Sequence, residues 1–290
     1  MQATPPIQWY PGHIAKAEKA LLEQLKRVDT VLEVRDARIP MASSHPQVPQ
    51  WIGEKPKILI LNRVDLISPK AAALWRDWFK SQGETPYFTD AKQGKGINAV
   101  AQAAQQAGAK LNQRRRDRGM NPRAVRAVVI GFPNVGKSAL INRLLNRRVA
   151  ESARKPGVTR QLRWIRISPD LDLLDAPGVL PSRLSDQAAA YRLAMCDDIG
   201  EGAYDRQLVA AALIDQIHRM ETCNTQVEHW IPDRPLQQRY SIVPETMTGE
   251  EYLAAVAQAK FQGDKERMAH HLLTDFRKGI LGPIALEFPP

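Results

Sequence analysis

Cysteine is scarce in this chain of 290 residues. Cys196 and Cys223 are its two cysteines, and neither belongs to a C-x-x-C pattern. The sequence therefore argues against a disulfide framework and against a zinc site, and it is typical of a protein in a reducing compartment. The histidines other than His13, including the pair His270-His271, show no zinc-binding spacing, so we interpret them as surface residues.

Long apolar runs are also missing. No run approaches the roughly 20 residues needed to cross a bilayer. The first residues, MQATPPIQWYPGH, lack the basic start and apolar stretch of a secretory signal. Hydrophobic residues make up 43% and charged residues 25%, as in soluble globular proteins. We expect a cytoplasmic protein without membrane contact, long enough for one large or two ordinary domains.

Acidic residues are few in the first part of the chain. Residues 1–185 contain 31 Lys and Arg but 15 Asp and Glu, a net charge of +16, whereas residues 186–290 carry −6 and the whole chain +10. This asymmetry predicts two domains, 1–185 and 186–290, and a polyanionic partner for the first. A basic surface that is merely well solvated is the alternative.

Hydrophobic periodicity indicates the fold class. Within residues 1–185, candidate strands alternate with candidate helices, which predicts an α/β fold with a doubly wound, mostly parallel sheet. Strands are expected at 30–34, 57–61, 86–89, 125–130, 162–167 and 171–174, and helices at 14–28, 70–80, 97–110 and directly after 138. We interpret 114–122 as a basic linker and 142–161 as a loop, and we expect an α-helical domain with helices at 208–220, 250–261 and 264–278.

Residues 131–138, GFPNVGKS, fit G-x-x-x-x-G-K-[ST] and lie between a β-branched run and an apolar-periodic segment. In such a strand–turn–helix context, this motif binds phosphates through backbone N–H groups and the helix N-terminus. Lys137 is expected on the β- and γ-phosphates, and the Ser138 hydroxyl on Mg²⁺. The expected nucleotide contacts of this loop are Asn134, Val135, Gly136, Lys137, Ser138 and Ala139.

Two downstream motifs fit the γ-phosphate side of such a site. Asp175-Ala176-Pro177-Gly178 fits D-x-x-G at a strand end, with Asp175 expected to hold Mg²⁺ through water and the Gly178 N–H to meet the γ-phosphate. Pro156-Gly157-Val158-Thr159 lies between the two motifs, and Thr159 is placed to add a hydroxyl to Mg²⁺ when the γ-phosphate is present. An ordinary surface threonine is the alternative.

Two upstream motifs fit base recognition. Asn62-Arg63-Val64-Asp65 differs from N-K-x-D by its arginine; Asp65 can accept two N–H bonds from a guanine edge, and Arg63 can lay its planar head over a base. Asp90-Ala91-Lys92 fits S-A-K with aspartate in place of serine, and the Ala91 N–H can reach the guanine oxygen. A plain turn and a plain loop are the alternatives, and an ATP-using P-loop enzyme is the rival to a GTPase.

These base-reading motifs precede the phosphate loop, whereas in an ordinary GTPase they follow it. This order, the segment Trp9–Lys16 (WYPGHIAK) and the helical tail resemble ribosome biogenesis GTPase A, the YlqF-like circularly permuted GTPases, over nearly the whole chain. The resemblance implies a GTPase that binds GTP, GDP and Mg²⁺. It also implies a cytoplasmic protein, monomeric when free, that acts on the large ribosomal subunit precursor, its rRNA and its ribosomal proteins. A non-catalytic, GTP-dependent binding switch is a second alternative.

The resemblance also implies residue roles. Val179 follows D-x-x-G, and a valine side chain cannot orient the attacking water. The histidine on which the family is thought to rely instead matches His13, which would act with Lys137 and Thr159; a structural turn residue is the alternative. Asn134 matches an asparagine through which related GTPases bind K⁺. The expected rRNA footprint is a set of basic residues in and around the predicted loop 142–161, which contains Thr159: Arg143, Arg147, Arg148, Arg154, Lys155, Arg160, Arg163 and Arg166.

Overall fold

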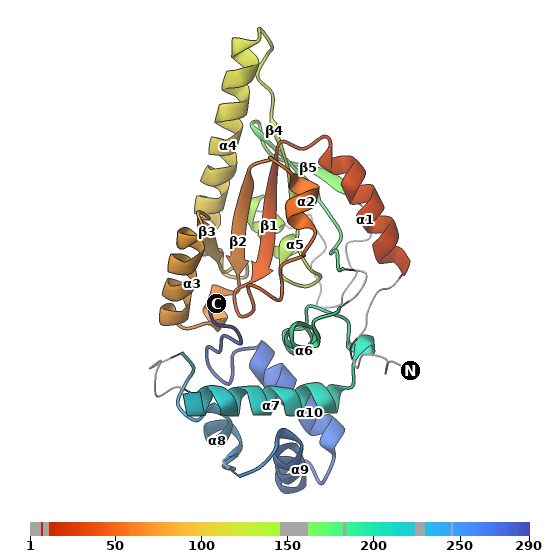
Figure 1. Cartoon of the computed structure of the whole chain (residues 1–290), viewed down its shortest axis with the longest axis vertical. Coiled ribbons are helices and arrows are strands. Elements are labelled where there is room, and N and C mark those ends of the chain that lie inside the picture. Colours follow the sequence, from red (N-terminus) through yellow and green to blue (C-terminus); the bar gives the residue numbers. More distant parts are fainter. Residues whose placement is uncertain (1–6, 8–11, 146–161, 182–183, 224–229, 245) are drawn as a thin grey trace.

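A mostly parallel sheet of six strands forms the centre of the computed structural model, which describes residues 7, 12–145, 162–181, 184–223, 230–244 and 246–290 (Figure 1). The strand order is β3-β2-β1-β4-β6-β5, and only the pair β5–β6 is antiparallel, as the predicted hairpin requires. The predicted α/β class is confirmed. The strands are β1 Thr30–Asp36, β2 Lys57–Asn62, β3 Pro86–Thr89, β4 Val125–Ile130, β5 Arg163–Ser168 and β6 Leu171–Asp175.

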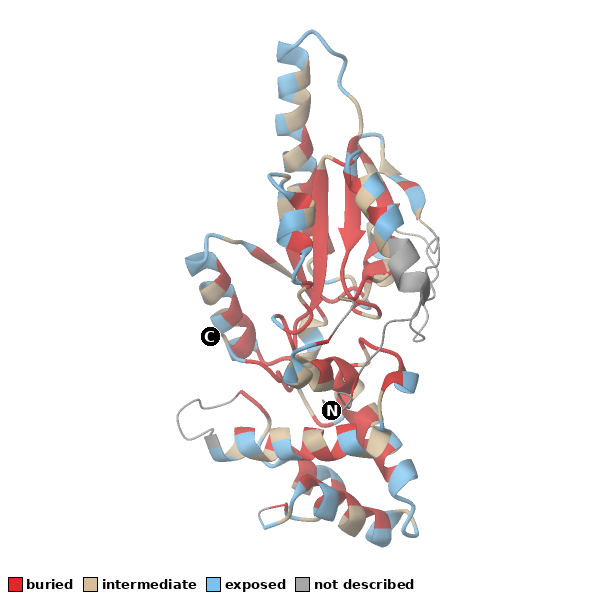
Figure 2. Cartoon of the chain, turned by 45° about the vertical axis from the view of Figure 1, so that its right-hand side comes forward, coloured by how far each residue is buried: buried red, intermediate tan, exposed pale blue. Residues whose placement is uncertain are grey.

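Helices cover both faces of this sheet, which explains why the central strands are almost continuously apolar (Figure 2). Along β4, side chains alternate between the two faces. Val125 meets Gly108 of α4, whereas Val128 belongs to a buried cluster with Leu21 and Leu25 of α1. The helices of this half are α1 Gly12–Leu25, α2 Val48–Ile52, η1 Val64–Leu66 (a 3-10 turn), α3 Pro69–Ser81, α4 Ile97–Asp117 and α5 Lys137–Leu144.

The remaining helices gather at the end of the molecule opposite the tip of α4 (Figure 1). Several of them begin at side-chain caps: Thr248 and Glu251 form the predicted capping box, Asp264 accepts the N–H of Arg267, and Asp186, which precedes the first of them, accepts the N–H of Ala189. These helices are α6 Gln187–Met195, η2 Glu201–Ala203 (a 3-10 turn), α7 Arg206–Cys223, α8 Pro235–Tyr240, α9 Gly249–Lys260 and α10 Lys265–Arg277.

The end of the chain returns to the sheet-bearing half. The Leu286 N–H donates to the Arg38 carbonyl at 2.9 Å, and the Glu287 carboxylate accepts the N–H groups of Met41 at 2.7 Å and Ala42 at 3.0 Å. One hydrophobic cluster also runs through both halves. The two halves are therefore firmly packed, and their division into domains 1–185 and 186–290 stays a prediction.

Two expectations about the basic segments are wrong. The arginines at 114–116 lie inside α4 and not in a linker, because Gln and Arg favour helix and arginine is stabilised near a helix C-terminus. The helix stops where Gly119 takes a left-handed conformation, with φ of 70°. The expected loop at 142–161 is helical at its start, since α5 continues to Leu144; residues 146–161 lie outside the described part.

Candidate functional site

The phosphate loop follows β4 at the carboxyl edge of the sheet and leads directly into α5. This is the edge at which parallel α/β sheets bind ligands. Gly136 has φ of 102°, and a Cβ there would lie 2.1 Å from the Asn62 amide nitrogen, so glycine is required for this close approach. Val135 is buried in the loop, and Ser138 and Ala139 lie in the first turn of α5.

The Lys137 side chain is buried beneath the phosphate loop. Its ammonium donates to the carbonyls of Phe132 at 2.8 Å and Gly131 at 3.2 Å. Burial lowers the pKa of Lys137 to about 8, against the opposing attraction of Asp175 and Asp198. The loop thus folds around a cation that can exchange carbonyl contacts for phosphate oxygens.

Asp175 ends β6 beside this loop, opposite Val129 of β4. Its side chain is buried, and among the described residues its Oδ1 has no hydrogen-bond partner. Burial raises the pKa of Asp175 to about 6, while Lys137 and Arg163 act in the opposite direction. A buried carboxylate oxygen that has no partner among the described residues, at the end of a strand beside the phosphate loop, fits a hard cation such as Mg²⁺.

The D-x-x-G segment lies against the phosphate loop. A Cβ on Gly178 would lie 2.6 Å from the Pro133 nitrogen, so a larger residue cannot take this position. The Val179 N–H donates to the Gly131 carbonyl at 3.2 Å. The Val179 side chain is buried in the α1-facing cluster and carries no polar atom, in agreement with its expected inability to orient water.

Asn62 joins three segments of the site. Its Nδ2 donates to the Val135 carbonyl at 2.8 Å, and its Oδ1 accepts from the Thr89 hydroxyl at 3.1 Å and from the Ala91 N–H at 3.0 Å. The Ala91 N–H expected to meet a guanine oxygen is therefore held by Asn62 in this structure. Asn62 thus aligns the phosphate loop with residues 90–92, the base loop.

The base loop is also organised by Asp90, which replaces the serine of S-A-K. Its Oδ1 accepts the N–H groups of Lys92 at 2.9 Å and Gln93 at 3.0 Å, a turn that aspartate favours. Arg143 of α5 donates to the carbonyls of Ala91 and Lys92, so this member of the expected rRNA footprint braces the base loop.

We expected the planar guanidinium of Arg63 to lie over a base, and this prediction is wrong. Arg63 takes a left-handed conformation, with φ of 66°. Its head points inward, donating to Asp36 at 2.6 Å, to the Cys196 carbonyl at 3.1 Å and to the Asn134 carbonyl. Buried carboxylates attract the guanidinium more strongly than an exposed base face can. Asp65 is largely exposed; the limited loss of solvent around its carboxyl, together with the negative charge of Asp90, raises the pKa of Asp65.

Sequence reasoning missed the buried charges around that guanidinium. Asp36, Arg38 and Asp198 lie together where the helical half meets the sheet edge, and Arg38 pairs with Asp36 at 2.7 Å. Burial raises the pKa of Asp198 well above its usual range, and Arg63 opposes this. The signal available was Arg35-Asp36-Ala37-Arg38 at a strand end, but nothing in it indicated its distant partners.

Asn134 is part of the same junction. It has φ of 57°, and its amide donates to the Asp197 carbonyl at 2.7 Å. The loop that would bind phosphates is thus hydrogen-bonded directly to the segment after α6. The K⁺ role of Asn134 stays a prediction.

Several expected residues are not placed. His13 lies in α1, but its side chain is outside the described residues. Thr159 is outside them altogether, as are five of the basic residues: Arg147, Arg148, Arg154, Lys155 and Arg160. Arg163 and Arg166 are exposed on β5, and Arg166 pairs with Asp172. Among the described helices, each is too short or too polar to span a bilayer.

Known proteins match both the sequence and the fold. A protein-family model described as 50S ribosome-binding GTPase matches residues 126–243. Ribosome biogenesis GTPase A from Priestia megaterium is 40% identical over 205 residues, covering 70% of this chain and 71% of the relative. The protein of that name from Bacillus cereus is 33% identical over 291 residues, covering 98% and 94%. GNP-bound YlqF from T. maritima shares the fold, with a TM-score of 0.62 at 23% identity over 94% of this chain and 98% of that one.

The sheet, the phosphate loop and the D-x-x-G segment define a P-loop GTPase with its base-reading motifs placed first. The chain belongs to the ribosome biogenesis GTPase A family. It therefore binds guanine nucleotide and hydrolyses GTP, which decides against an ATP-using enzyme and a non-catalytic switch.

Proposed function

We propose that this GTPase assists assembly of the large ribosomal subunit and that its bound nucleotide sets its affinity for the subunit. The observation that carries the nucleotide part is the convergence of Asn62, Lys137 and Asp175 at one edge of the sheet. They come from three separate segments of the chain, and each side chain is buried. Buried polar groups gathered at a sheet edge are typical of a binding site and not of a surface turn.

Each residue has a distinct part in the proposed site. Lys137 and the N–H groups of residues 134–139 bind the phosphates, Asp65 and Lys92 face the base, and the Gly178 N–H meets the γ-phosphate. Asn62 and Ala91 fix the base loop, and Arg63 fixes the phosphate loop from beneath.

Ser138, Thr159 and Asp175 would hold Mg²⁺, which when bound neutralises charge on the phosphates. The Asp175 oxygen that has no hydrogen-bond partner among the described residues is the structural support for this assignment. Asn134 would contribute to a K⁺ site in the same loop. Such a cation would add positive charge near the phosphates, in addition to the charge of Lys137.

Unstimulated hydrolysis is expected to be slow. Val179 presents no polar atom, so the attacking water lacks the usual orienting side chain. His13 supplies that function when the protein is bound to the ribosome. Activating groups of this type contribute about 10³–10⁵-fold.

The basic half of the chain supports rRNA as a partner, since residues 1–185 carry +16. The relatives in this family are named for ribosome biogenesis, and the matching family model is described as ribosome-binding. We propose that the protein meets the subunit precursor and its ribosomal proteins in the cytoplasm, as a monomer when free.

Co-sedimentation tests the proposal. Large-subunit precursors are centrifuged with the protein and GTP, GDP or a non-hydrolysable GTP analogue. We expect the analogue to give the tightest association and GDP the weakest. Equal association in all three nucleotide states would contradict the switch, and no association in any state would contradict the partner. Small subunits serve as the control.

A further inference from the structure

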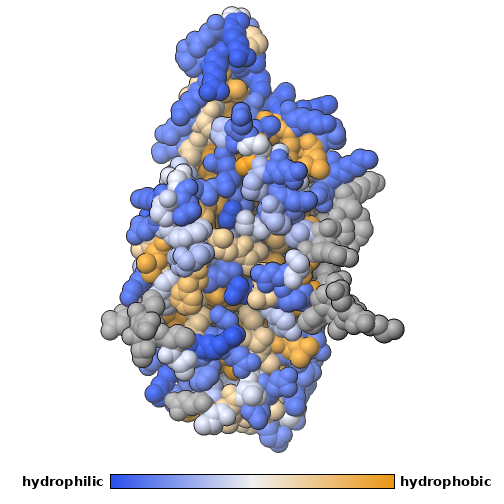
Figure 3. Space-filling view, in the orientation of Figure 1, coloured by the Kyte–Doolittle hydropathy of each residue, from blue (hydrophilic) through white to orange (hydrophobic). Residues whose placement is uncertain are grey.

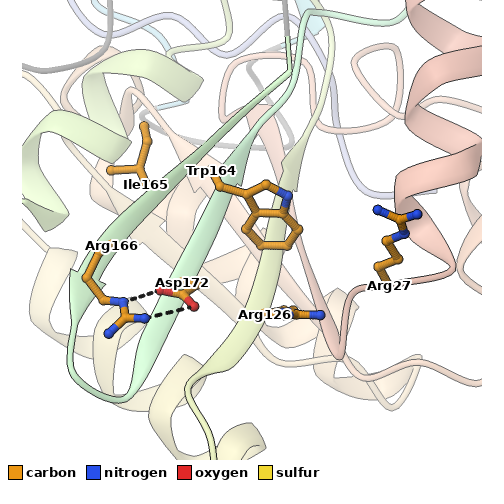
Figure 4. A pocket seen from close by; sticks show the side chains of 6 residues that line it. All are labelled: Arg27, Arg126, Trp164, Ile165, Arg166 and Asp172. Atoms are coloured by element: carbon orange, nitrogen blue, oxygen red, sulfur yellow. Dashed lines mark hydrogen bonds and ion pairs between the residues drawn. The ribbon is translucent and has the colours of Figure 1, made fainter.

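The indole of Trp164 lies on the surface of the edge strand β5, with 40% of the residue exposed. The next residue, Ile165, points to the other face of the sheet and is buried (Figure 4). The residue opposite Trp164 in β6 is Leu174, which is buried in the cluster beneath α1. Trp164 therefore lies on the α1-facing side of the sheet, and packing against the described residues leaves part of its indole exposed.

A hollow of about 460 Å³ lies beside this indole (Figure 4). Its volume is within the roughly 300–1,000 Å³ of small-ligand sites. Arg126 of β4, Asp172 of β6 and Arg166 of β5 form one row across the three strands, with Asp172 in the middle. Arg27, just after α1, completes the opposite side of the hollow.

The hollow is positively charged. Arg166 pairs with Asp172, and nearby Asp29 pairs with Arg123 at 2.7 Å. Within the described part of the chain, Arg27 and Arg126 have no acidic partner in an ion pair. The Arg126 guanidinium lies 5.9 Å from the Trp164 ring centre. Among the described residues, two cations without an acidic ion-pair partner thus line the hollow, and one of them, Arg126, lies beside the exposed indole.

We propose that this hollow binds one unpaired nucleotide of RNA, with its base stacked on Trp164 and its phosphate held by Arg27 and Arg126. The inference rests on the proposed rRNA partner and adds a defined contact to it. Aromatic stacking beside arginines is the usual way in which proteins hold unpaired nucleotides. An acidic peptide would satisfy the two arginines but would leave the indole face without a planar partner.

The surroundings favour a nucleic-acid strand over an isolated nucleotide. The C-terminal turn of α4 projects from the same end of the molecule (Figure 1), and its surface is strongly hydrophilic (Figure 3). A strand leaving the hollow meets further positive charge there, from Arg114, Arg115, Arg116 and Arg118.

The test measures binding of a fluorescent oligouridine to the full chain by anisotropy, using Trp164→Ala and Trp164→Phe. Leu208→Ala is the matched control, because Leu208 is 44% exposed on α7. Trp164→Ala is expected to weaken binding about tenfold, with most of it restored by phenylalanine. Polyphosphate, which has no bases, is expected to bind wild type and Trp164→Ala equally. GTP affinity is expected to stay unchanged, which shows that each variant is folded.

Arg27→Gln and Arg126→Gln are expected to weaken the binding of both oligouridine and polyphosphate and to reduce the salt dependence of that binding. Arg219→Gln on α7 is their control. Equal oligouridine affinity for Trp164→Ala and Leu208→Ala would overturn the proposed stacking. Protein that sediments with large subunits but binds no oligouridine would overturn this inference and leave the proposed function standing. Protein that binds neither would overturn both.

Discussion

Replacing Arg63 with methionine removes the guanidinium that joins the phosphate loop to the helical half. In the wild type this group bonds Asp36 at 2.6 Å and the Cys196 carbonyl at 3.1 Å, and lies 3.4 Å from Asp198. Both carboxylates are buried, whereas 24% of the Arg63 side chain is exposed. The variant therefore leaves two buried acids with Arg38 as their nearest remaining cation.

The expected cost follows from that geometry. Removing one partner of a fully buried ion pair costs about 3–5 kcal/mol. The partial exposure of Arg63 and the continued pairing of Asp36 with Arg38 reduce this, so we expect a loss of about 2–3 kcal/mol in the free energy of unfolding. Burial raises the pKa of Asp36, but Arg38 and Arg63 outweigh it and hold the pKa below its usual 3.8. That contribution is present above pH 3.8 and is lost on acidification, so the variant's deficit narrows as pH falls below about 4.

Urea unfolding at pH 7 and at lower pH measures this deficit. Arg166→Met is the matched control, because Arg166 also pairs with an aspartate but on the exposed surface of β5. It is expected to change stability by less than about 1 kcal/mol. Equal losses for the two variants, or a deficit at Arg63 that does not change with pH, would show that the buried contacts of Arg63 do not stabilise the fold as proposed.

Two further predictions concern the nucleotide itself. Lys137→Ala is expected to abolish GDP and GTP binding, measured with a fluorescent nucleotide; affinity within a few-fold of wild type would contradict the phosphate-loop assignment. The pKa of Asp175, raised to about 6 by burial, predicts that Mg²⁺-dependent nucleotide affinity falls as pH drops through about 6, because the carboxyl then binds a proton. Asp175→Asn is expected to remove that pH dependence, and an unchanged profile would exclude Asp175 as the titrating group.

Much of the sheet follows from local pattern. The β-branched run before Gly131 and the run at 57–61 predict buried strands, and the structure places them as β4 and β2. Ser68-Pro69 and Thr248-x-x-Glu251 mark helix starts because capping depends on neighbouring residues alone. The phosphate loop is equally local, since its strand, glycines and lysine are consecutive.

The contacts of Arg63 and Ala91 depend on distant residues, and here sequence reasoning failed. Nothing near position 63 indicates that Asp198, which follows α6, will share its pocket. The Ala91 N–H was expected to be available to a base, but it donates a hydrogen bond to the side chain of Asn62, which lies on a different strand, β2. The start of α4 at Ile97 was predicted, but its C-terminal end was missed for another reason: a run of arginines resembles a linker in charge, although its helix propensity is high.

We propose that turnover of this GTPase on the large subunit depends on His13. The most direct measurement is GTP turnover by wild type and His13→Ala, with and without large subunits and under saturating nucleotide. We expect slow turnover by both proteins alone, and strong stimulation by subunits for the wild type but not for the variant. Equal stimulation of both proteins, or none for the wild type, would contradict the proposed role of His13.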